Sequence, residues 1–220
     1  MQDLLQQLLN GLSQGSIYAL IAVGYTMIYG IIQLINFAHG DVMMVGAFVA
    51  LGAAMMGLGF IPSLLIAMLT CAFLGVVIER VAYRRVRPVS RLAALTSAIG
   101  VSLLLEYTMM YFLGADIRSF PSGILAERTY SLGGVLITNK ELLVLGTTLV
   151  LVIILQYIIY RTRTGKAMRA VSFDGQAAQL MGVNVNNTVA ITFFIGSAMA
   201  AAAGMLYGIC FNVQPLMGLM

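Results

Sequence analysis

The chain has 220 residues, of which 60% are hydrophobic and 9% are charged, and its net charge is +4. Its mean hydropathy is +0.96, whereas a soluble domain carries about 25% charged residues. The composition therefore excludes an ordinary soluble protein and predicts an all-α polytopic transmembrane bundle. No basic stripe with interleaved aromatic residues appears, so nucleic-acid binding is not expected.

Six apolar runs are long enough to cross a membrane. A hydrocarbon core requires about 20 apolar residues in a helix, and the runs near this length cover residues 15–35, 42–60, 61–78, 92–113, 142–160 and 189–211. The residues before the first run predict a short amphipathic lead-in to an uncleaved span. Gly and Pro residues within 57–62 predict a tight reversal between the second and third spans.

Polar residues interrupt the first two runs at residues 36–41, which include the only histidine of the chain. One interpretation is a turn at the membrane surface, in which Gly40 ends a helix and Asp41 caps the next. The other is a discontinuous helix at bilayer depth, where polar groups are costly and line a substrate path or a gate. The candidate path or helix-break residues are Asn36, Phe37, His39, Gly40 and Asp41.

Glu106 lies in the fourth run, fifteen residues beyond Arg91 and hence well inside the bilayer. An intramembrane carboxylate normally faces the bundle interior and forms hydrogen bonds there. We expect such a structural role for Glu106, with lining of the path as the second interpretation. Tyr107 should point to another side of the helix.

Arginine and lysine residues predict the orientation of the chain. Five arginines lie within residues 80–91 and four basic residues lie within 161–169, and short loops rich in Lys and Arg stay in the cytoplasm. The loop at 114–140 should then face outward, as should the N-terminus. The interruption at 36–41 should lie on the cytoplasmic half of the membrane.

The segment 161–188 should contain a short helix on the cytoplasmic side. Asp174 is a suitable N-cap and Gly182 a suitable C-terminal stop. An apolar edge with helical spacing consists of Phe173, Ala177, Leu180 and Met181. Such a short helix requires a partner to cover that edge, or it rests on lipid headgroups as an interfacial helix.

Small residues repeat every four positions in three spans and predict close helix contacts. The stripes are Gly11, Gly15 and Ala19; Gly46, Ala50, Ala53 and Gly57; and Gly196, Ala200, Gly204 and Gly208. Two cysteines, Cys71 and Cys210, lie in apolar runs and are interpreted as small buried hydrophobes, because their setting fits neither a disulfide framework nor a metal site.

Four motifs in the same order resemble LivH-type permeases, the membrane subunits of ABC importers for branched-chain amino acids. The first runs from Gly24 to Ile31 and continues with Ile35 to Asp41. The others are Glu79 to Arg84, Ser97 to Gly100, and a long pattern that extends from Gly165 to Gly204. The resemblance covers nearly the whole chain and implies a single permease domain at 1–220. Family members continue through further spans, so the chain is expected to lack the C-terminal spans.

The resemblance implies a subunit that binds no cofactor and works with several partners. A second permease subunit, two cytoplasmic ATPases that hydrolyse ATP, and a periplasmic binding protein would complete an importer for leucine, isoleucine and valine in the bacterial inner membrane. The ATPase-coupling segment would include Arg163, Gly165, Arg169, Ala170, Asp174, Ala177, Ala178 and Gly182.

Three alternatives remain open at this stage. Related permeases import urea or short amides and carry a similar Ala-His-Gly break. A proton-driven secondary transporter could use Glu106 or His39, and an intramembrane enzyme could use Asp41 with His39. No Gly-rich phosphate loop and no His-x-x-x-His motif supports catalysis or a metal centre, so we expect no enzyme.

Overall fold

The computed structural model describes residues 2–87, 89–121, 124, 128–132 and 135–219. Six of its helices are long and apolar enough to cross a membrane, which confirms the all-α polytopic bundle. The elements are α1 (Gln2–Ile32), α2 (Ala38–Met55), α3 (Phe60–Ile78), the π-helical turn η1 (Glu79–Tyr83), α4 (Arg91–Leu113), β1 (Thr129–Leu132), β2 (Val135–Thr138), α5 (Asn139–Arg161), α6 (Arg163–Phe173), α7 (Gly175–Leu180), α8 (Val185–Cys210) and the 3₁₀ turn η2 (Met217–Leu219).

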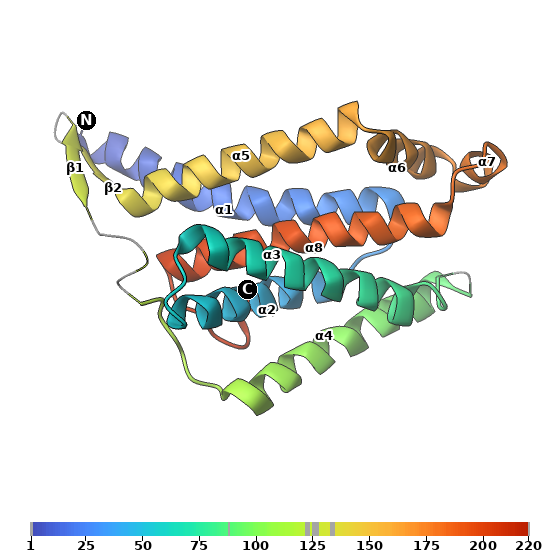
Figure 1. The fold of residues 1–220 in the computed structure, drawn as a ribbon, viewed down its shortest axis with the longest axis horizontal. Coiled ribbons are helices and arrows are strands. Elements are labelled where there is room, and N and C mark those ends of the chain that lie inside the picture. The colour runs from blue at the N-terminus through green and yellow to red at the C-terminus, as the bar shows by residue number, and fades with distance from the viewer. Residues whose placement is uncertain (1, 88, 122–123, 125–127, 133–134, 220) are drawn as a thin grey trace.

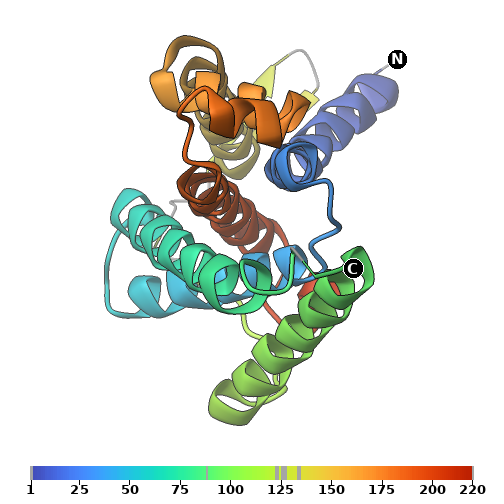
Figure 2. The ribbon, with the colours of Figure 1, turned by 90° about the vertical axis from the view of Figure 1, so that its right-hand side faces the viewer.

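The two most buried spans form the centre of the bundle. In α8 78% of the apolar window is buried and in α2 72%, against 22% in each of α1, α4 and α5. Viewed end on, α8 is surrounded by α1, α3 and α5, and α4 lies at the edge of the bundle beside α2 (Figure 2). The peripheral helices therefore present apolar side chains to lipid, as expected of a membrane protein.

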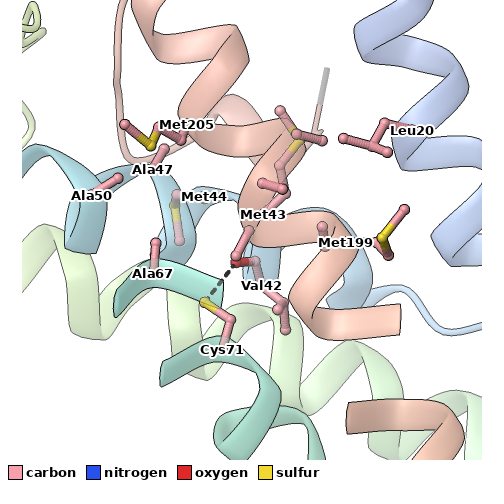
Figure 3. Close-up of a cluster of buried hydrophobic side chains, with 14 of the residues drawn as sticks. Leu20, Val42, Met43, Met44, Ala47, Ala50, Ala67, Cys71, Met199 and Met205 are labelled. Atoms are coloured by element: carbon pink, nitrogen blue, oxygen red, sulfur yellow. Dashed lines mark hydrogen bonds between the residues drawn. The ribbon is translucent and has the colours of Figure 1, made fainter. Parts of the chain in front are cut away.

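Close contacts between α2 and α8 depend on small residues. Gly204 faces the carbonyl of Met43, and Gly46 faces Ala201, so that a Cβ at either glycine would overlap the opposite helix. Met43, Met44, Met199 and Met205 fill the space around this contact, and the Cys71 thiol donates to the carbonyl of Val42 over 3.5 Å (Figure 3). The structure confirms the packing role of the α8 stripe and of the α2 stripe up to Ala53, whereas a Cβ at Gly57 would meet no heavy atom within 4 Å. Cys71 is buried as predicted, and Cys210 is only partly buried.

The small-residue stripe of α1 does not pack in this way. A Cβ at Gly11 or Gly15 would have no heavy atom within 4 Å, and Ala19 is exposed. The prediction of a close contact there was wrong within this chain. The residues predicted as a lead-in form the start of α1, which is one continuous helix from Gln2.

The loops divide between the two ends of the bundle in agreement with the predicted alternation. The N-terminus and the β1–β2 hairpin lie at one end, and α6, α7 and the turn after η1 lie at the other (Figure 1). Gln6 ties the first of these ends together: its side chain donates to the carbonyl of Leu136 and accepts from its N–H, at 2.9 and 2.8 Å. The predicted reversal between α2 and α3 is present, with Gly57 at φ +82°.

The interruption between α1 and α2 lies at residues 33–37. Gln33 ends α1 in the left-handed region, at φ 55°, and α2 begins inside the bundle, short of the end that α3 reaches (Figure 1). Ala38 to Asp41 form the first turn of α2. The surface-turn interpretation, in which Gly40 ends one helix and Asp41 caps the next, was therefore wrong.

Candidate functional site

Two carboxyl groups meet where the first turn of α2 contacts α4. Asp41 is 1% exposed and Glu106 is 4% exposed. The Ser102 hydroxyl donates to Oδ2 of Asp41, and the Glu106 carboxyl group interacts electrostatically with that of Asp41. Glu106 is thus not an isolated carboxylate, and Tyr107 points outward as predicted, with 66% of its surface exposed.

The spacing of the buried residues in α4 explains why Glu106 lies opposite Asp41 of α2. The buried residues of α4 are Ala94, Ala98, Ser102 and Glu106, which follow one another every four residues and so share one helix face. Two small residues allow the helices to approach, and the two polar ones then lie opposite Asp41. Because Oδ1 of Asp41 and Oε1 of Glu106 have no hydrogen-bond partner among the described residues, these oxygens can accept from a hydrogen-bond donor.

His39 lies on the other side of α2, against α1. Its ring makes an edge contact with Tyr25 at 5.7 Å between centroids. A Cβ at Gly24 would lie 3.3 Å from Nε2 of His39, so the glycine makes room for the imidazole. His39 is 2% exposed. The structure therefore separates His39 from the carboxyl pair by the width of α2, whereas Phe37 is 48% exposed and belongs to neither group.

Asn36 is anchored from a distant part of the chain. The Tyr83 hydroxyl donates to Oδ1 of Asn36 over 2.9 Å, and both side chains are buried. The carbonyl of Asn36 accepts the N–H of His39 over 3.2 Å. Gly40 contacts the backbone of Gly218 so closely that a Cβ there would overlap the Gly218 carbonyl.

An ion pair lies beside Tyr83. Arg84 binds both carboxylate oxygens of Glu79, at 3.2 and 2.7 Å, and Glu79 is fully buried. Sequence reasoning used Arg84 for the orientation of the chain and noted both Glu79 and Arg84 within a family motif, but did not pair them. No residue spacing in the sequence connects Tyr83 with Asn36, 47 positions earlier.

The predicted short helix between the fifth and sixth spans is present as α7. The Asp174 side chain accepts from the N–H groups of Gln176 and Ala177 at 2.9 and 3.0 Å, and Gly182 ends the helix at φ +85°. The residues predicted to form the apolar edge are exposed, at 94% for Phe173, 89% for Leu180 and 85% for Met181. They do not share one helix as predicted, because Phe173 ends α6 and Met181 follows α7. Ala177 is also exposed, while Ala178 is buried.

The sequence did not predict α6, which precedes α7 and carries the basic residues. Thr162 caps it by accepting from the N–H of Gly165 over 3.1 Å. Gly165 packs against the C-terminal carbonyls of α5, so that a Cβ there would overlap the carbonyl of Ile159. Arg169 donates to that same carbonyl and lies over the ring of Tyr160, 5.4 Å from its centroid. Arg163 and Ala170 are exposed.

A cavity of about 430 Å³ lies at the opposite end, between α1, α5 and the hairpin. Asn10, Ser13, Lys140 and Glu141 contribute polar groups to its wall. None of the predicted path residues lines this cavity. Within the described part of the chain no group of three His, Cys, Asp or Glu side chains could hold a metal ion.

Comparisons with known proteins identify the family. A family model described as the permease component of branched-chain amino acid transport systems matches residues 7–220. The chain is 43% identical to the high-affinity branched-chain amino acid transport system permease protein BraD of Pseudomonas aeruginosa, over 95% of this chain and 72% of the relative. It is 40% identical to the permease protein LivH of Escherichia coli strain K12, over 98% and 74%. No solved structure matches. The chain therefore belongs to the branched-chain amino acid transport system permease family.

Proposed function

We propose that this chain is the membrane-spanning permease subunit of an ATP-driven importer for leucine, isoleucine and valine. Residues 1–220 belong to one permease domain of a bacterial inner membrane, with the N-terminus outside. A second permease subunit and a periplasmic binding protein complete the importer, and two cytoplasmic ATPases hydrolyse the ATP. The chain itself is not an enzyme and binds no cofactor.

The observation that carries this proposal is a group of exposed apolar side chains in and beside α7: Phe173 at the end of α6, Leu180 in α7 and Met181 directly after it. Phe173, Leu180 and Met181 are each at least 85% exposed, although α7 has only six residues. A helix of that length does not hold its shape alone in water, and exposed apolar side chains on a capped helix suit docking into a groove. A cytoplasmic ATPase provides such a groove in the proposed importer.

Family membership supports branched-chain amino acids as the substrates. The pair of Asp41 and Glu106 supports a translocation path that passes the start of α2. Asp41, Ser102 and Glu106 bring oxygen atoms together inside the bundle, at the start of a central helix. Intramembrane carboxyl groups at such places mark substrate or gating paths. We assign Asn36, His39 and Gly40 to the support of the same turn.

The docking of α7 is tested by placing a charge on its apolar edge. Leu180→Asp adds a carboxylate at a side chain that is 89% exposed, so the permease keeps its fold while an apolar groove loses its contact. We expect the ATPase subunits to co-purify with the wild-type chain and not with the variant. Val89→Asp is the matched control, because Val89 is 76% exposed in the loop after η1 at the same end of the bundle.

Uptake of labelled leucine by vesicles that contain all the subunits tests the transport function. ATP-dependent uptake of leucine in preference to urea supports the proposal. Retention of the ATPases by Leu180→Asp, or uptake driven by a pH gradient with this chain alone, would count against it. Reaction of a cysteine at Gln176 only from the inside of intact cells would support the orientation.

A further inference from the structure

We propose that a chain of hydrogen bonds and one ion pair transmits movement from the coupling segment α6–α7 to the first turn of α2. The relay starts at Asn186 with two branches, one through Arg87 and one through Arg84 to Glu79. Both branches join at the backbone of the π-helical turn that carries Tyr83, and Tyr83 contacts Asn36. All of these are positioning residues, since none of them needs to touch the transported molecule. The inference rests on the proposed function, because it assigns the route by which the ATPases act on the path.

The relay begins at the start of α8, which follows α7 after a short linker. The side chain of Asn184 caps α8 by accepting from the N–H of Asn187 over 3.0 Å. Asn186 lies in the same turn, where its Oδ1 accepts from Arg87 over 2.9 Å. Its carbonyl accepts from Arg84 over 3.5 Å. If a displacement of α7 moves the start of α8, Asn186 moves with it and shifts its two partners, Arg84 and Arg87.

The middle of the relay is the π-helical turn η1. Arg84 holds the carboxylate of Glu79 with two hydrogen bonds, a geometry that fixes orientation as well as distance. The N–H of Arg84 also bonds to the carbonyl of Glu79 over 2.7 Å. Single π-helical turns of this kind are frequent at functional sites. The Ser97 hydroxyl donates to the carbonyl of Ala82 over 2.9 Å and so links α4 to the same turn.

The far end of the relay is the contact between Tyr83 and Asn36. The Tyr83 ring packs on Phe193 of α8, with 5.2 Å between the centroids, so η1 is held to α8 at a second level. Its hydroxyl reaches Oδ1 of Asn36. Asn36 in turn accepts the N–H of His39. Movement of η1 is thus applied two residues before α2, next to the turn that carries Asp41.

The surroundings of the coupling segment leave room for such movement. A cavity of about 300 Å³ separates Val171 and Phe173 of α6 from Ile31, Arg87 and Val189. Because this space is not filled by side chains, the C-terminal end of α6 has room to shift toward the ends of α1 and α8, while Gly165 stays packed on α5. Arg87 lines the cavity and donates to Asn186, so the relay borders the space in which the segment can move.

The relay is tested at its far end by Tyr83→Phe, which removes one hydroxyl and keeps the ring on Phe193. The variant is assembled with the ATPases and the binding protein in vesicles, and leucine uptake per ATP hydrolysed is measured. We expect this ratio to fall about fivefold, the effect of losing roughly 1 kcal/mol of coupling, with unchanged ATPase binding. Tyr29→Phe is the control. Tyr29 lies in the last turn of α1, and its hydroxyl makes no hydrogen bond among the described residues.

The near end is tested by two substitutions of Asn186. Asn186→Ala removes the Oδ1 acceptor of Arg87, while the backbone carbonyl at this position still accepts from Arg84. It should lower the ratio by less than Tyr83→Phe does, whereas Asn186→Asp retains an acceptor for Arg87 and should keep the wild-type ratio. In the double variant of Asn186→Ala with Tyr83→Phe, the ratio should be close to that of Tyr83→Phe alone, since both branches reach Asn36 through Tyr83.

Multiplication of the two losses in the double variant would overturn the relay, and so would a ratio that stays at the wild-type value in both single variants. If Tyr83→Phe reduces the amount of assembled complex, the comparison of Ala with Asp at position 186 decides the question. Failure of the proposed function would appear separately, as absence of ATP-dependent uptake by the wild-type complex.

Discussion

Replacement of Gly46 by alanine tests the contact between the two central helices. A Cβ at Gly46 would lie 2.6 Å from the Cβ of Ala201, whereas carbon atoms in contact prefer about 3.5–4.0 Å. The two helices would have to separate by roughly 1 Å, and overpacking of this kind costs about 1–3 kcal/mol. Gly52 lies in the same helix, where a Cβ would meet no heavy atom within 4 Å, so Gly52→Ala is the matched control.

The difference between the two variants isolates the overpacking cost. Each replacement removes one helical glycine and gains up to about 1 kcal/mol of helix propensity, and this gain cancels in the comparison. A change of 1 kcal/mol shifts the midpoint of thermal unfolding by about 2–4 °C in a protein of this size. We therefore expect Gly46→Ala to unfold at least about 2 °C below Gly52→Ala in the same detergent. Equal or higher stability of Gly46→Ala would refute the close contact.

Three further outcomes follow from single sites. Arg84→Ala should destabilise the chain by about 3 kcal/mol, at the low end for a broken buried pair because Arg84 is partly exposed; Glu79→Gln added to it should recover part of the loss in the same thermal assay. Gly182→Ala should weaken co-purification of the ATPases, because the backbone at Gly182 has φ +85°, which is strained for alanine and disturbs the end of α7. Gly175→Ala should not weaken it, because a Cβ at Gly175 would have open space around it. Cys71 should stay unmodified by maleimide in the folded protein and react after unfolding, since it is fully buried; fast labelling before unfolding would contradict its placement.

The lengths of the apolar runs were sufficient to predict the spans. The run at 92–113 agrees with α4 (Arg91–Leu113) to one residue, because the need to cover the hydrocarbon core fixes both ends. Capping chemistry was equally local, so the N-cap at Asp174 and the stop at Gly182 could be predicted from a few residues. Helix α6 was missed because its basic residues resemble a loop when no partner face is known.

Contacts between distant residues could not be derived in this way. Gly11 and Gly15 allow a close approach just as Gly46 does, but a repeat of small residues does not reveal whether a neighbour is present. The two members of the acidic pair were predicted as separate candidates, because a carboxyl group such as Asp41 or Glu106 is costly at bilayer depth. Their contact was not predicted. Their meeting depends on how α4 lies beside α2, and no periodicity in one helix contains that information.

The wide turn at Glu79–Tyr83 makes its own ion pair possible. In a regular α-helix, side chains five positions apart point about 140° away from each other, so Arg84 would face away from Glu79. The extra residue per turn brings the guanidinium onto the carboxylate, which is 0% exposed. If this turn changed to ordinary α-helical geometry, the Arg84 guanidinium would move away from Glu79 and leave its carboxylate buried without a charged partner. The π-helical turn therefore allows the ion pair to form, and the ion pair in turn stabilises the π-helical turn.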